Sequence, residues 1–167
     1  IYLTNDYQRS VSGKINCKIV NVCGNTVMEK SFAASVGPNS SVIANTIDVK
    51  SYVDEESRRR HIMFLEFVSE TGITSDNAVF FTRPKHIELE NPYLKAEIIE
   101  SDGKNHKVMI TANKPALWVW IDIEGINAKY SDMFFHMLPE NPVTISITTE
   151  NIIDADDITK RLKTYSL

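Results

Sequence analysis

The sequence predicts an all-β protein built from two β-sandwich domains in tandem. Short runs of alternating apolar and polar residues recur along the 167 residues, and clusters of Gly, Pro, Asn, Asp and Ser separate these runs. No segment shows the apolar period of a helix of ordinary length. Many strands joined by frequent turns, without such helices, are typical of a sandwich.

The junction between the two modules lies in residues 80–89, Phe-Phe-Thr-Arg-Pro-Lys-His-Ile-Glu-Leu. An apolar run ends at Phe81, and the proline at position 84 lacks the amide donor that an interior strand position needs. An alternating pattern then restarts, which predicts that a strand begins within this stretch. We therefore place one domain at 1–83 and the second at 84–167.

The first domain is predicted to open with a hairpin and a third strand. Residues 11–22 alternate between apolar and polar side chains, which predicts a strand with one solvent-exposed face. A Gly-Asn turn at 24–25 leads to a returning strand at 27–36. A second turn at 37–41, Gly-Pro-Asn-Ser-Ser, precedes a strand at 42–47.

The rest of the first domain is predicted as a loop and two strands. Asp48 is placed to cap a short helical turn. Residues 54–60 contain three acidic and three arginine residues whose charges nearly cancel, which favours a solvated loop over an anion site. Residues 62–68 are apolar on both faces, which predicts a central strand covered on both sides. After a Thr-Gly turn at 71–72, residues 76–82 close the domain.

The second domain shows the same pattern of alternating strands separated by turns. Alternation at 94–98, an Asp-Gly-Lys-Asn turn at 102–105 and inward apolar residues at 108–112 predict a hairpin. Later strands are predicted at 143–147 and 162–165.

Residues 116–123 form a predicted strand that is apolar on both faces, with Trp118 and Trp120 on one of them. Two indoles at this spacing could stack on sugar rings, so both residues are candidate sugar-binding residues for a weak carbohydrate contact. Aromatic side chains more often contribute buried area to cores and interfaces. We therefore favour packing for this pair.

Composition places the chain among globular proteins, with 43% hydrophobic and 24% charged residues. The net charge of −4 argues against nucleic acid as a partner, because phosphate binding needs a concentrated basic surface. No apolar run approaches the roughly 18 residues of a membrane span, so no membrane partner is expected. The chain opens at Ile1 in an apolar strand without an initiator methionine, which indicates an excised fragment.

Metal, cofactor and redox chemistry are not predicted. Cys17 lies in a strand and Cys23 at a turn, about 20 Å apart if the segment between them is extended, so both are expected to be thiols. The acidic connection at 151–158 lacks the central glycine and closing glutamate of a calcium loop, so it is expected to be an exposed connection. Asn39-Ser-Ser is a glycosylation sequon, relevant only in a eukaryotic secretory protein. The four histidines show no ligand spacing: His61, His86, His106 and His136.

Four segments, in their order along the chain, indicate a family. Residues 1–6 (Ile-Tyr-Leu-Thr-Asn-Asp), 80–89, 131–140 (Ser-Asp-Met-Phe-Phe-His-Met-Leu-Pro-Glu) and 161–167 (Arg-Leu-Lys-Thr-Tyr-Ser-Leu) resemble the C-terminal immunoglobulin-like domains of glycoside hydrolase family 2 β-mannosidases. The first segment is similar to the opening strand of the penultimate domain, the second to the link, and the last two to parts of the final domain. The match departs from the family at Met133, where asparagine is favoured.

The resemblance implies two immunoglobulin-like sandwiches without catalytic residues of their own. In the resembled family the parent hydrolyses terminal β-D-mannosyl residues by a retaining mechanism, and the two catalytic glutamates belong to an upstream barrel. The implied partner is therefore that barrel, which the sandwiches would support, in a parent that is periplasmic or secreted. Most of the 22 acidic residues fall at turns or on polar strand faces, with Glu66 the main exception, so no catalytic carboxylate pair is predicted.

Two other classes of protein remain open at this point. A carbohydrate-binding module would present Trp118 and Trp120 on an exposed platform. A cell-surface adhesion module would present a self-contained surface to a partner. An accessory domain separated from its barrel would instead expose an apolar patch.

Overall fold

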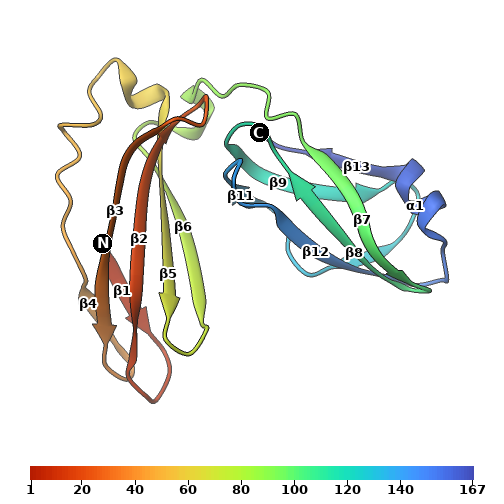
Figure 1. Ribbon diagram of the computed structural model, residues 1–167, viewed down its shortest axis with the longest axis horizontal. Coiled ribbons are helices and arrows are strands. Elements are labelled where there is room, and N and C mark those ends of the chain that lie inside the picture. Colours follow the sequence, from red (N-terminus) through yellow and green to blue (C-terminus); the bar gives the residue numbers. More distant parts are fainter. The chain divides into compact units, whose positions relative to one another are not determined.

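The structure, a computed structural model, describes residues 1–167. It consists of two compact units, Ile1–Glu88 and Leu89–Leu167 (Figure 1). Each unit has its own hydrophobic core. The fold is all-β with tandem sandwiches, as the sequence predicts.

Unit 1 contains six strands in two antiparallel sheets. The larger sheet has the order β3-β2-β5-β6, and β1 pairs with β4 in the smaller one. The alternating run that begins at Val11 forms the long strand β2, which pairs with β3 on one side and β5 on the other. The elements are β1 Tyr2–Asn5, β2 Val11–Asn21, β3 Thr26–Val36, β4 Ser40–Ile43, the 3-10 turn η1 Ser57–Arg59, β5 His61–Ser69, β6 Thr74–Phe80 and the 3-10 turn η2 Pro84–His86.

The core of unit 1 forms where alternate residues of the two sheets face inward. Ile15, Cys17 and Ile19 of β2 are buried with Met63 and Phe67 of β5. The predicted hairpin of β2 and β3 is confirmed. Neither cysteine forms a disulfide, and Cys17 is buried in this core as predicted.

Two details of unit 1 differ from the sequence predictions. The strand expected at 42–47 is only β4, Ser40–Ile43, because the chain leaves the sheet after pairing with β1. Strand β5 is central, but its second face is covered only near Ile62, and Glu66 and Val68 are exposed. The face of a strand can therefore change from buried to open within a few residues.

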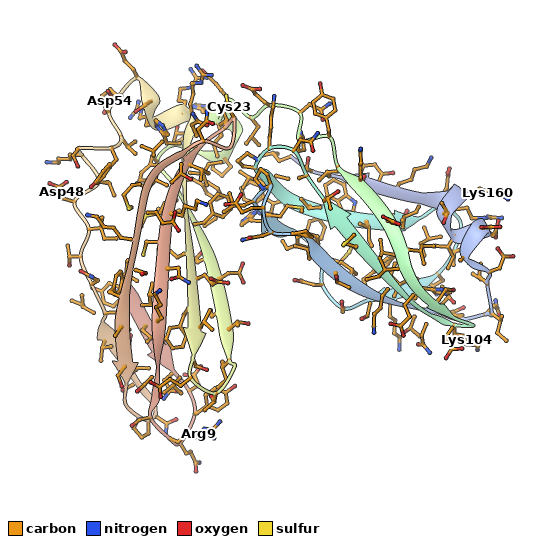
Figure 2. The ribbon with its side chains drawn as sticks, viewed as in Figure 1. Arg9, Cys23, Asp48, Asp54, Lys104 and Lys160 are labelled. Carbon is orange, nitrogen blue, oxygen red and sulfur yellow. The ribbon has the colours of Figure 1, made fainter.

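The connection between β4 and β5 is held by local hydrogen bonds, and Figure 2 labels Asp48 and Asp54 along it. The predicted turn at Asp48 is confirmed, since its carboxylate accepts from the Lys50 amide at 3.0 Å. Two of the three arginines in this loop form ion pairs. Arg58 pairs with Glu55 at 3.0 Å, and Arg59 lies 3.4 Å from a Glu88 carboxylate oxygen.

The link between the units does not begin as a strand. The strand expected within 80–89 is wrong, because Pro84–His86 forms the turn η2 and the next strand starts at Lys95. Arg59 holds this segment to unit 1: its Nε donates to the His86 carbonyl at 3.0 Å, and its own carbonyl accepts from the Glu88 amide at 2.8 Å.

Unit 2 contains seven strands in two sheets, with the orders β10-β12-β8-β7 and β11-β9-β13. Inward residues of both sheets form its core. Residues that share this core include Val108, Ile110, Val119, Ile121, Ile123, Ile145 and Ile147. The elements are β7 Lys95–Asp102, β8 Asn105–Thr111, β9 Ala116–Ile123, β10 Ala128–Tyr130, β11 Phe135–Met137, β12 Val143–Thr149, the helix α1 Ala155–Arg161 and β13 Leu162–Tyr165.

The acidic connection contains a short helix that the sequence analysis missed. Figure 1 shows α1 next to the start of β13. The Asp154 carboxylate accepts from the Asp157 amide at 2.8 Å and caps the helix, and Ile158 is fully buried. The interpretation of this stretch as a wholly exposed connection is therefore wrong. None of the helices has the length and apolar character needed to cross a bilayer.

Candidate functional site

Glu66 and Asp76 are the candidate for a catalytic carboxylate pair. They are direct partners across β5 and β6, and such partners have Cβ atoms about 5 Å apart. A retaining glycosidase holds its two carboxyl groups about 5 Å apart, so acidic partners on adjacent strands are a candidate pair. Both side chains are exposed on an open sheet face, and Glu66 accepts from Asn16 Nδ2 at 3.0 Å. Nothing around them excludes water or holds a sugar ring, which glycoside hydrolysis requires.

Three surface hollows of about 350, 360 and 390 Å³ lie elsewhere. Lys104 and Lys129 line the first, at the end of the β7–β8 hairpin where Figure 2 labels Lys104. The second lies on the outer face of β8 and β12, and the third beside Asp54 and His61. All three are open to solvent and are lined mainly by polar residue types, whereas ligand pockets are enclosed and lined mainly by apolar residues. No group of three His, Cys, Asp or Glu side chains is placed to hold a metal ion.

The outer face of the β11-β9-β13 sheet carries a row of aromatic rings. Trp120 stacks on Tyr165, its partner across β9 and β13, with ring centroids 4.8 Å apart and an interplanar angle of 16°. Phe134, just before β11, lies 5.6 Å from Trp120 at 36°. Because β11 and β13 flank β9 on opposite sides, Trp120 lies between the other two rings. We call Trp120, Phe134 and Tyr165 the aromatic ridge.

Trp118 sits at an irregularity in the same sheet. The register between β9 and β11 shifts there, and the φ of Trp118 is 48°, in the left-handed region. Its amide donates to His136 Nδ1 at 3.1 Å, and its ring meets the His136 ring edge-on at 4.9 Å. A bulge of this kind turns side chains away from simple alternation.

The structure therefore brings Trp120 together with two rings that the sequence analysis did not single out. The strand β9 is not covered on both faces as expected, because Trp118 and Trp120 are each only half-buried. Yet a sugar platform needs an open ring face, and Tyr165 and Phe134 flank both sides of the Trp120 indole. This geometry favours packing for Trp120, and sugar contact by Trp118 and Trp120 stays a prediction. Tyr165 had one sequence signal, the alternation of the last strand, and Phe134 had none.

His106 is the most deeply buried ionisable side chain of unit 2, at 2% exposure. Ser101 Oγ lies 2.9 Å from its Nδ1, while its Nε2 is buried without a hydrogen-bond partner. Burial lowers the pKa of His106, because the charged imidazolium loses its hydration.

Because the pKa of His106 is lowered in the folded chain, the free energy of unfolding should depend on pH. The unfolded chain binds a proton at His106 below about pH 6.5, while the folded chain resists it, so the free energy of unfolding should fall as pH drops below that value. We expect His106→Asn, which can keep the contact with Ser101, to flatten this dependence. Urea unfolding above and below about pH 6.5 measures it. Equal slopes for the variant and the wild type would contradict the assignment.

The fold defines the chain as a pair of tandem immunoglobulin-like β-sandwiches. Residues 1–86, more than half of the chain, match the family model described as the mannosidase Ig/CBM-like domain. Residues 89–167 match the model of a mannosidase Ig-fold domain. The chain belongs to the mannosidase Ig/CBM-like domain family, and its second unit matches the Ig-fold domain of mannosidases. The family expected from the sequence motifs is confirmed.

Solved structures agree with this assignment at the level of the fold. A β-D-mannosidase from Dictyoglomus thermophilum matches 99% of this chain and 20% of its own length, with 24% identity and a TM-score of 0.78. An exo-chitosanase from Amycolatopsis orientalis matches 99% of this chain and 24% of its own length, with 13% identity and a TM-score of 0.68. The chain thus spans about a fifth to a quarter of these structures. No curated protein sequence matches it.

Proposed function

We propose that this chain is the non-catalytic C-terminal part of a retaining family 2 glycosidase, a β-mannosidase that removes terminal β-D-mannosyl residues. Its two sandwiches support an upstream catalytic barrel. The observation that carries the proposal is the tandem order of the two mannosidase-associated families over nearly the whole chain. The β-D-mannosidase among the solved structures supports the choice of substrate.

The carboxylates support a non-catalytic role for the chain itself. Glu66 and Asp76 face each other across β5 and β6 but are exposed on an open sheet face, without an enclosing site. A retaining enzyme uses one carboxylic acid and one carboxylate in a shielded site, where positioning and desolvation lower the barrier. An open face supplies neither.

The purified chain is therefore expected to hydrolyse no aryl β-mannoside. The measurement is release of the aryl group over many hours at high protein concentration. Glu66→Gln and Asp76→Asn serve as matched controls, because a contaminating glycosidase would leave the rate equal in all three samples. Turnover by the wild type that either substitution abolishes would overturn the proposal.

A further inference from the structure

Phe134 has an unfavourable backbone conformation that the packing of unit 2 does not explain. Its φ is 61°, a region that residues with a bulky side chain rarely adopt. Its side chain remains 57% exposed. The ring contact given by the structure is the tilted one with Trp120. A strained and largely exposed aromatic residue contributes little to the stability of its own unit. This indicates that Phe134 makes a contact with something outside unit 2.

The residues around Phe134 have the composition of a protein–protein interface. Trp120, Phe134 and Tyr165 form a continuous row, with Tyr165 42% exposed. The next row of the same face pairs Asp122 of β9 with Lys163 of β13, both exposed. Aromatic residues at the centre and charged residues at the rim are typical of protein–protein contacts.

We propose that the aromatic ridge is the surface through which unit 2 packs on the catalytic domain of its own glycosidase chain. The inference rests on the proposed function. In the two solved glycosidases the matched region is 20% and 24% of the chain, so most of the polypeptide that could cover the ridge lies outside that region. The flanked indole presents edges rather than an open face, which suits insertion between protein side chains and not the stacking of a sugar.

The test is Phe134→Asn, introduced into both the isolated chain and the full-length glycosidase. Asparagine tolerates a left-handed φ, so the isolated chain should unfold at the same temperature as the wild type or slightly higher. In the full-length enzyme, loss of an aromatic contact at an interface should speed thermal inactivation about tenfold.

Tyr93→Asn is the matched control, because Tyr93 is also an aromatic residue with positive φ, at 49°, is 60% exposed and precedes β7, a strand of the other sheet. It should leave the inactivation rate of the full-length enzyme within about twofold of the wild type.

Each other result overturns the inference in a recognisable way. If Phe134→Asn destabilises the isolated chain as much as the full enzyme, the ridge serves packing within unit 2. If both variants leave the full enzyme unchanged, the ridge is not the docking surface, although the proposed function stands. If Phe134→Asn abolishes saturable binding of manno-oligosaccharides by the chain, the occupant is a carbohydrate. If the gene encodes no catalytic domain, the proposed function fails and the inference fails with it.

Discussion

Replacing Gly13 with alanine is expected to unfold unit 1 well below the temperature at which the wild type unfolds. Gly13 lies in β2 between β3 and β5. A Cβ built there would stand 2.3 Å from the Val68 carbonyl oxygen, 2.7 Å from Ser69 Cα and 2.8 Å from the Phe67 ring. Two of these atoms belong to the backbone, so the central strands would have to separate. We expect a cost of about 3 kcal/mol, at the upper end of the usual range for overpacking.

The two tryptophans allow the prediction to be tested unit by unit. Both lie in unit 2, so tryptophan fluorescence reports its unfolding, whereas far-UV circular dichroism reports both units. In Gly13→Ala part of the dichroism signal should be lost early while the fluorescence transition remains. Gly37→Ala is the control, since its Cβ would meet only the Ser40 hydroxyl at 3.3 Å. A Gly13→Ala protein that melts like Gly37→Ala would refute the close approach of β2 and β5.

Replacing Ile121 with alanine is expected to produce the corresponding loss in unit 2. Ile121 is fully buried in β9, the central strand of its sheet, and belongs to the core formed with the opposite sheet. Truncating a buried isoleucine removes apolar contacts and leaves a cavity, which costs about 2 to 5 kcal/mol. Since Trp120 adjoins it on the same strand, the fluorescence transition should move to lower denaturant.

Two controls separate the cavity from a general effect of substitution. Ile121→Val removes a single methylene and should cost about 0.5 to 1.5 kcal/mol. Ile152→Ala changes an isoleucine that is 77% exposed and should stay within about 0.5 kcal/mol of the wild type. Equal unfolding midpoints for Ile121→Ala and Ile152→Ala would show that β9 does not occupy the core.

The long strands could be predicted from the sequence because their periodicity persists. Strand β2 alternates over eleven residues, and one face is the core. The helix α1 could not be found in this way, since seven residues give fewer than two turns and only Ile158 is buried. Its visible signals were the capping Asp154, the acidic first turn and Lys160 with Arg161 in the last turn.

The aromatic ridge could be predicted only in part. Alternation places Trp120 and Trp118 on the same face of one strand, but the bulge at Trp118 leaves no trace in the residue pattern. Phe134 and Tyr165 reach Trp120 because β11 and β13 both pair with β9, and that order of strands is a tertiary property. Whether a tryptophan face is open or flanked depends on those neighbours, so single-strand patterns could not decide between a sugar platform and packing.

An aryl β-mannoside assay on three samples distinguishes a chain that supports a glycosidase from one that performs its chemistry. These are the full-length parent, the parent truncated before Ile1, and residues 1–167 alone, each assayed during incubation at rising temperature. We expect turnover by the parent, none by the chain alone, and a truncated parent that either fails to accumulate in soluble form or loses activity at a distinctly lower temperature. A truncated parent as active and as heat-stable as the full-length enzyme would contradict this expectation.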